Sequence, residues 1–357
     1  MKNTIGILGV LLVTFVVLTG WGATSVAGIV LALFWLGAAL YARFFPTFQP
    51  FCYPLVVLGC VTTSMYFPGM YRVWFGQNTT DFVTPILQVI MFGMGTQLAW
   101  KDFRQIAIQP WGVFIGVGLQ FCVMPLVGFF IVSVFSFPKE VAAGILLVGC
   151  VPSGIASNVM NFLARSNVAL SVTLTTVATL LGPILTPLWM KILIGDTLEL
   201  DYTQMAWTIL NLVVLPILAG LLVKSIFLSR LSEKARIAFE RFLGFFSMVG
   251  LLLTIVFINA AGRDALLSIG FLLILACLLH NTLGYFLGYV LAKCCGLDES
   301  SCRTVSIEVG MQNGGLAAGI ATQLGKAATM GLAPAICSPL MNITGASLAI
   351  WWRGRRS

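Results

Sequence analysis

Glu308 is the residue of this sequence whose type and position are best suited to chemistry. It lies within an apolar segment at 304–324, whereas the other eleven acidic residues fall in or beside loops. An ionised carboxylate inside hydrocarbon costs several kcal/mol, so such an acid must face a partner, water or an ion. Glu308 is therefore the first candidate for a functional site.

The residues around Glu308 are poorly suited to a continuous helix. The stretch SIEVGMQNGG at 306–315 places polar side chains and three glycines in the middle of the apolar segment. A helix that breaks here would free backbone carbonyls, which would join the Glu308 carboxylate and the Gln312 amide as hard oxygen ligands. Such ligands suit an alkali cation better than a soft metal. The alternative is a polar kink packed between helices.

A second interruption lies about half the chain earlier. The stretch PSGIASN at 152–158 breaks the apolar segment at 140–164, and Asn158 precedes Asn313 by 155 residues. Broken spans in corresponding positions of two halves are typical of inverted-repeat transporters, whose binding site lies near the middle of the membrane.

Three further polar residues could converge on Glu308. Ser171 and Thr175 are four residues apart and share one helix face, and Gln120 stands in the apolar run at 113–132. Hydroxyls in membrane helices ordinarily bond to their own backbone. As a set facing Glu308, however, these side chains would supply further oxygens to a cation.

The composition indicates that these residues are positioned by membrane helices. The chain has 357 residues, of which 59% are hydrophobic and 9% are charged, against about 25% charged in soluble domains. A span needs about 20 apolar residues, and strand-type alternation is absent. We therefore expect an all-α polytopic membrane protein. Twelve apolar segments lie at 4–19, 22–44, 51–68, 83–100, 111–135, 140–164, 166–194, 205–227, 238–259, 265–293, 304–324 and 329–352.

The ten segments from 51 onward divide into two sets of five. An odd number of spans per repeat turns the second copy upside down in the membrane. We expect a first repeat at 49–196, an inverted second repeat at 202–352 and a basic cytoplasmic tail at 353–357, preceded by an extra transmembrane hairpin at 1–48. The first span could instead be a secretory signal, although no clear small-residue cleavage site precedes Ala23.

The basic residues predict the orientation. With 20 Lys and Arg against 12 acids the net charge is +8, but the basic residues occupy short gaps between apolar runs, which does not suit nucleic acid. With the amino terminus inside, five basic residues fall outside, namely Arg72, Lys139, Lys191, Arg263 and Lys326. The inside set, which predicts two cytoplasmic termini, is Lys2, Arg43, Lys101, Arg104, Arg165, Lys224, Arg230, Lys234, Arg236, Arg241, Lys293, Arg303, Arg353, Arg355 and Arg356.

Other function classes find little support. No Ser/His/Asp set, paired carboxylates or phosphate loop can be assembled, so we expect no enzyme. Most of the nine cysteines lie within spans, where they serve as small apolar side chains. Cys294, Cys295 and Cys302 share a loop but lack the spacing of a structural zinc site.

Several motifs, in order and spacing, resemble the bile acid:sodium symporter family. They are MFGMG at 91–95, DFR at 102–104, ASNVM at 156–160, NVALSV at 167–172, EVGMQN at 308–313 and GLA at 315–317. The resemblance covers about residues 50–352. It implies a ten-helix, 5+5 inverted-repeat fold with two crossed broken helices. A core of the third to fifth helices of each repeat would move against a panel of the first two.

The resemblance also implies two sodium sites that share Glu308. One would use Ser157, Asn158, Ser171, Thr175 and Glu308; the other would use Gln120, Glu308, Gln312 and the backbone oxygens of Val309 and Met311. Asn313 and Asn342 match positions that contact substrate. This chain departs from the family at Ile155, where threonine is frequent, and at Met341, where many bacterial members have histidine. These departures make the expected pocket more apolar.

Charge balance gives a reason for coupling. Two Na⁺ beside one carboxylate leave a net +1 in a low-dielectric site, which a monoanionic substrate would neutralise. We expect a sodium-coupled carrier, a symporter of a bile-acid-like or small carboxylate anion, in the cell membrane. We expect a monomer with Na⁺ as coupling ion and no organic cofactor. The alternative is a sodium-independent or proton-coupled exporter of organic anions on the same fold.

Overall fold

The computed structural model describes residues 2–46, 48–98, 108–195 and 198–355. The DFR motif at 102–104, three basic residues of the charge count (Lys101, Arg104 and Arg356) and the expected repeat end at 196 lie outside these residues. Helices make up 84% of the structure, which confirms the all-α class.

Each of the twelve apolar segments contains helix. The first part of the chain forms α1 (Lys2–Gly20), α2 (Thr24–Arg43), η1 (Gln49–Phe51), α3 (Cys52–Tyr66), α4 (Gly69–Arg72), η2 (Thr79–Phe82), α5 (Val83–Gln97), α7 (Pro110–Val134), α8 (Lys139–Cys150), α9 (Ile155–Leu163) and α10 (Val168–Ile194). The second part forms α11 (Tyr202–Ile209), the π-helix η4 (Leu210–Val214), α12 (Leu215–Ile226), η5 (Leu228–Arg230), α13 (Glu233–Ala261), α14 (Arg263–Cys294), α15 (Glu299–Gly310), α16 (Gly314–Gln323) and α17 (Leu332–Arg353).

Seven helices in the described residues are long and apolar enough to cross a membrane, counting α11, η4 and α12 as one. The other five predicted spans are shorter. The apolar part of α1 covers Gly6–Gly20, α3 and α5 have 15 residues each, and two spans are divided into α8 with α9 and α15 with α16.

A small β-hairpin was not predicted. Strands β1 (Val73–Trp74) and β2 (Gln77–Asn78) pair through a two-residue turn in which Phe75 and Gly76 have φ of 54° and 79°. Two positive φ values give the turn type that matches strand twist, and so short a hairpin leaves no periodicity in the sequence.

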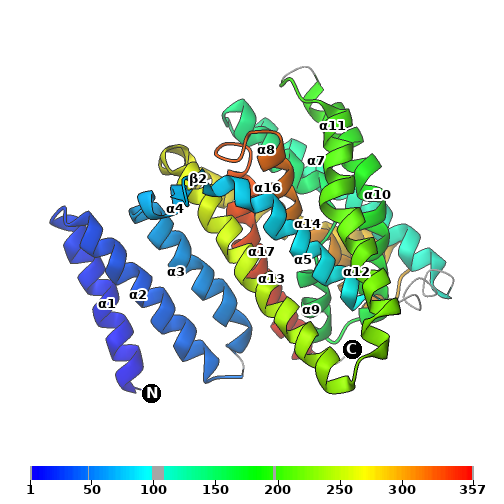
Figure 1. The fold of residues 1–357 in the computed structure, drawn as a ribbon, viewed down its shortest axis with the longest axis horizontal. Coiled ribbons are helices and arrows are strands. Elements are labelled where there is room, and N and C mark those ends of the chain that lie inside the picture. Colours follow the sequence, from blue (N-terminus) through cyan, green and yellow to red (C-terminus); the bar gives the residue numbers. More distant parts are fainter. Residues whose placement is uncertain (1, 47, 99–107, 196–197, 356–357) are drawn as a thin grey trace.

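The first two helices lie at one end of the molecule. Figure 1 shows α1, α2 and α3 as neighbouring, roughly antiparallel helices, with α1 against α2 and α2 against α3. Gly28 of α2 faces the Tyr66 ring of α3 so closely that a Cβ atom would collide with it. The amino-terminal hairpin is therefore closely packed against the rest of the chain.

Close glycine contacts also join α5 to α12. A Cβ at Gly95 would meet the Ile217 carbonyl, and one at Gly220 would meet the Phe92 carbonyl. Small residues let membrane helices approach at backbone distance. These glycines make α5 and α12 one closely packed pair.

Two arginines tie the corner between α13 and α14 to the corner that follows α3. Arg72 Nε donates to the Ala260 carbonyl at 3.0 Å, and Arg263 Nε donates to the Met65 carbonyl at 2.5 Å. Each arginine therefore binds a carbonyl near the carboxyl end of a helix, where backbone acceptors lack partners within the helix. Gly262, between α13 and α14, has no room for a side chain beside the Ala328 carbonyl.

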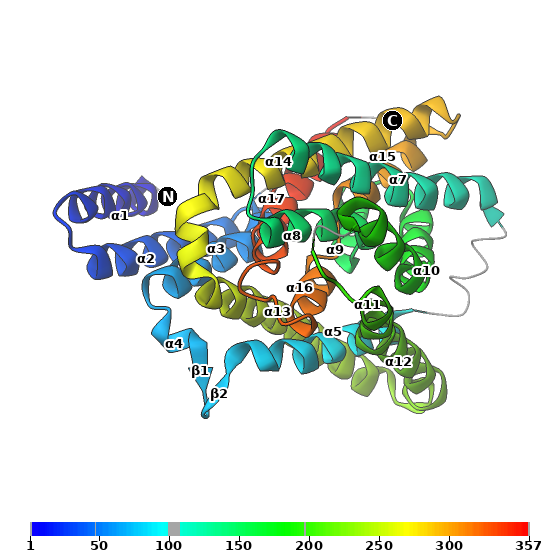
Figure 2. The same cartoon turned by 90° about the horizontal axis from the view of Figure 1, so that it is seen from above.

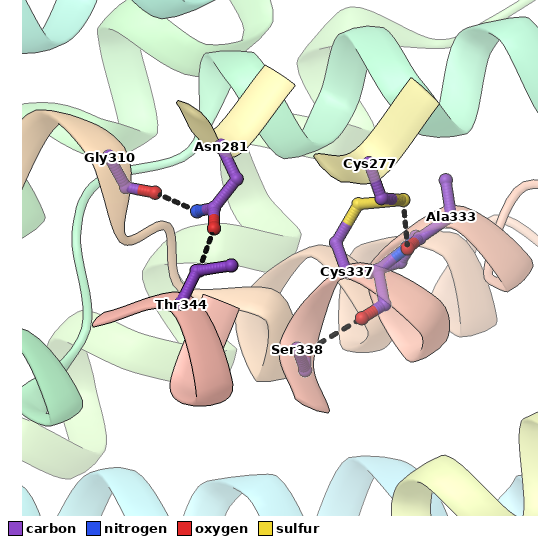
Figure 3. Close-up of a disulfide and its surroundings, with 8 residues drawn as sticks. Cys277, Asn281, Gly310, Ala333, Cys337, Ser338 and Thr344 are labelled. Atoms are coloured by element: carbon purple, nitrogen blue, oxygen red, sulfur yellow. Dashed lines mark hydrogen bonds between the residues drawn. A yellow bond between two sulfur atoms is a disulfide. The ribbon is translucent and has the colours of Figure 1, made fainter. Parts of the chain in front are cut away.

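Two cysteines of the apolar spans are bonded to each other. Cys277 of α14 and Cys337 of α17 form a disulfide across a sequence separation of 60 residues, and Figure 3 shows it between the two helices. This differs from the expectation that span cysteines serve as small apolar side chains. Sequence spacing carries no signal for the pair, because the contact depends on how α14 and α17 are packed.

Candidate functional site

The two interrupted helices meet at their interruptions. Ser153, between α8 and α9, forms an isolated antiparallel bridge with Gln312, between α15 and α16. The Asn313 amide nitrogen donates to the Pro152 carbonyl at 2.8 Å. The breaks expected at 152–158 and 306–315 are therefore present, at 151–154 and 311–313, and they lie against each other.

Local sequence explains where the half-helices start and stop. Asn313 caps α16, because its Oδ1 accepts from the Leu316 amide at 3.0 Å, and Asp298 caps α15 through the Ser301 amide. Pro152 has no amide hydrogen to continue α8. Glu308 consequently lies in the last turn of α15, one turn before the break, and not within it.

The Glu308 carboxylate is surrounded by uncharged donors. Glu308 is 1% exposed. Its Oε1 accepts from Ser171 Oγ at 2.5 Å and Asn161 Nδ2 at 3.3 Å. Its Oε2 accepts from Ser153 Oγ at 2.5 Å and Thr175 Oγ1 at 2.9 Å. Among the described residues no Lys, Arg or His forms an ion pair with it.

The Ser171 hydroxyl has more oxygen neighbours than its hydrogen can serve. Its Oγ lies 2.6 Å from Asn158 Oδ1 as well as 2.5 Å from Glu308 Oε1, and a hydroxyl carries one hydrogen. Thr175 repeats the pattern, with Glu308 Oε2 at 2.9 Å and Asn158 Oδ1 at 3.3 Å. Hard cations prefer such groups of carboxylate, amide and hydroxyl oxygens, so the donor chemistry fits Na⁺.

Of the first predicted sodium group, the structure gathers Asn158, Ser171 and Thr175 around Glu308. Ser157 is buried beside them at 0% exposure. Its hydroxyl donates to the Gly154 carbonyl at 2.7 Å, within its own turn. The structure therefore assembles four of the five residues through direct contacts and places the Ser157 side chain close to the Glu308 carboxylate.

The second predicted group forms a chain of amides. Gln120 Nε2 donates to Gln312 Oε1, and Gln312 Nε2 donates to the Val309 carbonyl, both at 2.6 Å. Gln120 Oε1 is buried without a partner in the described structure, and such an acceptor costs about 1–3 kcal/mol. A cation beside it would remove that cost. Among the described residues no hydrogen bond joins this group to the Glu308 carboxylate. Glu308 belongs to the group only as the chain neighbour of Val309.

Met311 belongs to the second group through its backbone alone. Met311 lies in the break between α15 and α16, where a backbone carbonyl does not accept the regular hydrogen bond of a continuous helix. Its side chain is 1% exposed and points to Gly345 of α17. The thioether therefore packs between helices.

The four predicted substrate residues occupy different surroundings. Asn313 is 8% exposed; its Oδ1 caps α16, which leaves the Nδ2 group to donate to a ligand. Ile155 lines a cavity of about 310 Å³ together with Asn158 and Thr175. Asn342 Nδ2 donates to the Ser338 carbonyl of its own helix at 2.9 Å, and Met341 packs in the hydrophobic core at 4% exposure.

This cavity separates α5 from α9 and α10. Its lining includes Met94, Gln97 and Leu98 near the end of α5, along with Phe162 and Thr176. Asn158 and Thr175 thus take part in both the oxygen cluster and the cavity wall. A ligand in the cavity would lie directly beside the oxygen cluster.

Sequence reasoning missed three residues of this site. Ser153 and Asn161 both donate to Glu308, and Asn161 follows Asn158 by three residues, a spacing that places both on one helix face. Asn281 of α14 donates to the Gly310 carbonyl at the break and accepts from Thr344 of α17, as Figure 3 shows. Its polar type in an apolar span was the available signal.

Comparison with known proteins places this chain in a family. The model of the sodium bile acid symporter family matches residues 84–269. The chain is 38% identical over 287 residues to an uncharacterized sodium-dependent transporter, YocS, of Bacillus subtilis (strain 168), an alignment that covers 80% of the chain and 86% of that protein.

Two plant proteins are also similar over most of their length. The chain is 33% identical over 303 residues to the probable sodium/metabolite cotransporter BASS2, chloroplastic, of Oryza sativa subsp. japonica, covering 84% of the chain and 69% of that protein. It is 36% identical over 306 residues to the probable sodium/metabolite cotransporter BASS1, chloroplastic, of Arabidopsis thaliana, covering 84% and 72%. With its apolar helices, the chain is an integral multi-pass membrane protein that belongs to the sodium bile acid symporter family.

Proposed function

We propose that this protein is a sodium-coupled symporter of an organic anion, bile-acid-like or a small carboxylate, that works by alternating access. The observation that carries the proposal is the buried Glu308 carboxylate, which has four uncharged hydrogen-bond donors and, among the described residues, no cationic partner. The names of its relatives, a sodium-dependent transporter and sodium/metabolite cotransporters, point the same way.

The first sodium ion would bind among the oxygens that lack hydrogens. Its proposed ligands are Ser157, Asn158, Ser171, Thr175 and Glu308. The contacts of Ser171 and Thr175 with both Asn158 Oδ1 and Glu308 support this set. Ser157 would join it by turning its hydroxyl away from the Gly154 carbonyl.

The second sodium ion would bind at the break in the other interrupted helix. Its proposed ligands are Gln120, Gln312, Glu308 and the carbonyls of Val309 and Met311. The unpartnered Gln120 Oε1 supports this site. Binding there requires the Gln120 and Gln312 amides to exchange their mutual hydrogen bond for the ion.

The helices would form two inverted repeats of five spans after the hairpin at 1–48. The first repeat would hold α3, α5, α7, α8 with α9, and α10; the second would hold α11 with α12, α13, α14, α15 with α16, and α17. The fourth span of each set is the interrupted one, which supports the assignment. In this arrangement α3, α5, α12 and α13 belong to the panel, and the crossed half-helices belong to the core.

Charge balance would couple the anion to sodium. Two Na⁺ beside one carboxylate leave one positive charge in a buried site, and a monoanion beside Asn313 would neutralise it. The Asn313 amide can donate to an anion without adding a charge. A coupling free energy of about 1 to 3 kcal/mol between sodium and anion is typical of such linkage.

A sodium-independent or proton-coupled exporter is the alternative. In that case the Glu308 site would hold a proton, and the hydroxyls of Ser171 and Thr175 would matter less. The Ser171 and Thr175 hydroxyls each lie close to both Asn158 Oδ1 and a Glu308 oxygen, but each carries one hydrogen. One added proton could bridge only one of these oxygen pairs, whereas a cation could contact several oxygens. This favours the sodium-coupled carrier.

The test is the sodium dependence of stability and anion binding in purified protein. We expect sodium chloride to raise the thermal midpoint above that in potassium chloride of equal ionic strength, because a ligand bound to the folded state stabilises it. The Glu308→Gln variant should lose this difference, whereas Glu299→Gln, an acid at the far end of the same helix, should keep it.

Anion binding is measured in the same two salts with pyruvate, pantoate and taurocholate as probes. Sodium should raise the affinity for at least one of them in the unmodified protein and for none of them in Glu308→Gln. Equal midpoints and equal affinities in sodium and potassium would refute the proposal.

A further inference from the structure

A cavity lies at the end of the molecule where α2, α9 and α17 finish. It has a volume of about 370 Å³, and its wall is formed by Pro46, Pro50, Leu163, Ile350, Arg353 and Gly354. Helix α17 packs against α9, α3 and η1, and Figure 1 shows the carboxyl ends of α2 and α17 toward the bottom of the view. The cavity therefore lies among helix ends on the side where the charge count predicts the cytoplasm.

The wall of this cavity is apolar apart from one side chain. Pro46 and Pro50 belong to the linker between α2 and α3, and a proline has no amide hydrogen to donate. The Gly354 amide already donates to the Ile350 carbonyl at 3.3 Å. The Arg353 guanidinium is therefore the strong hydrogen-bond donor that this wall offers to a ligand.

The surroundings of the cavity carry positive charge without a partner of opposite sign. Three further arginines follow or precede a lining residue by three positions or fewer, namely Arg43, Arg165 and Arg355. These three and Arg353 are exposed, and within the described part of the chain none of the four forms an ion pair. No acidic residue is among the lining residues. The cavity is thus complementary in charge to an anion.

Helix ends account for some of this charge but not for the cavity. Arg43 and Arg353 lie in the last turns of α2 and α17, where a cation interacts favourably with the helix dipole. That role requires neither a cavity nor an apolar wall beside the guanidinium. Arg353 has both, which suits an anion that also carries an apolar part.

Aromatic side chains place the cavity at the level of lipid headgroups. Trp352 is buried and holds the end of α17 against the bundle, whereas its neighbour Trp351 is 49% exposed and lies under the Arg355 guanidinium, 3.8 Å from the ring centroid. Phe44 and Phe48, in the linker after α2, are also exposed. Exposed aromatic rings at the ends of membrane helices are typical of the interface between hydrocarbon and water.

We propose that this cavity binds the headgroup of an anionic phospholipid of the phosphatidylglycerol type, with the phosphate on Arg353 and the glycerol and upper acyl chain against the apolar wall. A guanidinium donates parallel N–H groups to a phosphate, and basic pockets between membrane helices bind anionic headgroups. A volume of about 370 Å³ lies near the lower end of the roughly 300–1,000 Å³ of ligand sites, which suits a headgroup.

The wall favours a lipid over a soluble phosphate. A free phosphate would contact Arg353 and gain nothing from Pro46, Leu163 or Ile350, whereas a lipid would bury apolar surface against them. The headgroup of phosphatidylcholine carries a cation of its own, which the four arginines would repel. The site therefore selects for net negative charge and for an attached acyl chain.

The first test compares three probes on protein that has been washed free of lipid in detergent. In potassium chloride without sodium, phosphatidylglycerol should raise the thermal midpoint by about 3 °C or more, because a ligand of the folded state stabilises it. Phosphatidylcholine and glycerol 1-phosphate should change it by less than about 1 °C. An equal rise with phosphatidylcholine would show a general effect of lipid, and an equal rise with glycerol 1-phosphate would show a free-phosphate site; either would overturn the proposal.

The second test locates the headgroup with matched arginine variants. Arg353→Gln should raise the half-saturating concentration of phosphatidylglycerol about ten-fold or more, because it removes the charged donor, and Arg353→Lys should restore part of the affinity. Arg230→Gln is the control and should change it less than two-fold. Arg230 is an exposed basic residue of η5, which follows α12, and Figure 2 shows α12 apart from α17, with other helices between them. Equal losses in Arg353→Gln and Arg230→Gln would show unspecific attraction to an anionic surface and overturn the site.

The third test reverses the charge of the wall without changing its shape. Gly354 has a φ of −77°, and a Cβ there would lie 3.7 Å from its nearest neighbour, the Trp351 carbonyl, so side chains fit at this position. Gly354→Glu should abolish the response to phosphatidylglycerol, whereas Gly354→Gln, of the same size but uncharged, should keep most of it. Equal responses of the two variants would overturn recognition of a negative headgroup beside Gly354.

Native mass spectrometry counts the bound lipid. One phosphatidylglycerol should remain on the unmodified protein and on Arg230→Gln, and none on Arg353→Gln at the same collision energy; equal retention by all three would overturn the proposal. Lipid binding requires no sodium. A protein that retains the lipid but does not respond to sodium would refute the proposed transport function and leave the lipid site standing, and the reverse result would refute the lipid site alone.

Discussion

Ser153 pairs through its backbone with Gln312, and its side chain donates to Glu308 on the same interrupted helix. The two interruptions are therefore joined by a backbone bridge and by a hydrogen bond to the buried carboxylate. A change in the groups that contact Glu308 therefore alters contacts of both interrupted helices. Asn313, the proposed substrate residue, follows Gln312 in the chain. Sodium bound at the proposed sites could therefore affect the position of Asn313 through this contact.

Ser171 should matter for sodium far more than a neighbouring hydroxyl. Hydrogen bonds to charged groups contribute about 1.5–3 kcal/mol, so Ser171→Ala should raise the half-saturating sodium concentration about ten-fold or more. Thr173, whose hydroxyl donates to the Ala169 carbonyl of its own helix, is the control, and Thr173→Ala should change it less than two-fold. Sodium titration of the thermal midpoint measures both, and equal shifts would contradict the proposed ligand set.

Two glycines should respond differently to substitution by alanine. Gly220→Ala places a Cβ against the Phe92 carbonyl and the Thr96 amide, and overpacking of this kind costs about 1–3 kcal/mol. At Gly118 of α7, apart from the backbone of its own helix, no atom lies within 4 Å of the position that an alanine methyl group would occupy, so Gly118→Ala should be neutral or slightly stabilising. Thermal unfolding in detergent compares them; a Gly220→Ala protein as stable as the unmodified chain would contradict the close packing of α5 and α12.

The number of cysteines that react with an alkylating reagent should show whether Cys277 and Cys337 form a disulfide. Seven of the nine cysteines are free, so protein denatured without reductant should take up seven alkyl groups, and nine after reduction. In Cys277→Ala, all eight remaining cysteines should react without reductant. Intact-mass measurement reads these numbers, and nine adducts before reduction would exclude the Cys277–Cys337 bond.

Removal of α1 should leave the sodium response intact. Helix α1 packs against α2, and each described partner of Glu308 comes from the turn at 151–154, from α9 or from α10. Deletion of residues 2–20 should therefore change the half-saturating sodium concentration less than two-fold, although the thermal midpoint falls. A variant that folds but no longer responds to sodium would place the hairpin in the coupling mechanism.

Apolar runs predicted where helices occur better than where they begin. The span expected at 304–324 begins earlier, at Glu299, because Asp298 caps it and the i,i+4 pair of Arg303 with Glu299 supports a polar first turn. Likewise α13 begins at Glu233, behind the cap Ser232, and not at 238. Hydropathy does not register capped, charged first turns.

The sequence could single out Glu308 because a lone acid in an apolar span is rare, but it could not reveal which residues reach it. Asn161 and Ser153 lie in another helix pair, 147 and 155 residues away. Their approach depends on how the two interrupted helices cross. The same holds for the Gln120–Gln312 amide pair, 192 residues apart.

The reciprocal arginines of the α3 and α13 corners hold two helix ends together at one end of the long helices. Arg72 and Arg263 fasten these helix ends to each other, and Gly262 joins α13 to α14 there at a position where a Cβ would collide with the Ala328 carbonyl. A rotation between α13 and α14 would therefore pivot about this fastened corner. The largest excursion would fall at the far ends of the two long helices, so the corner would act as a fulcrum if one helix set rocked on the other.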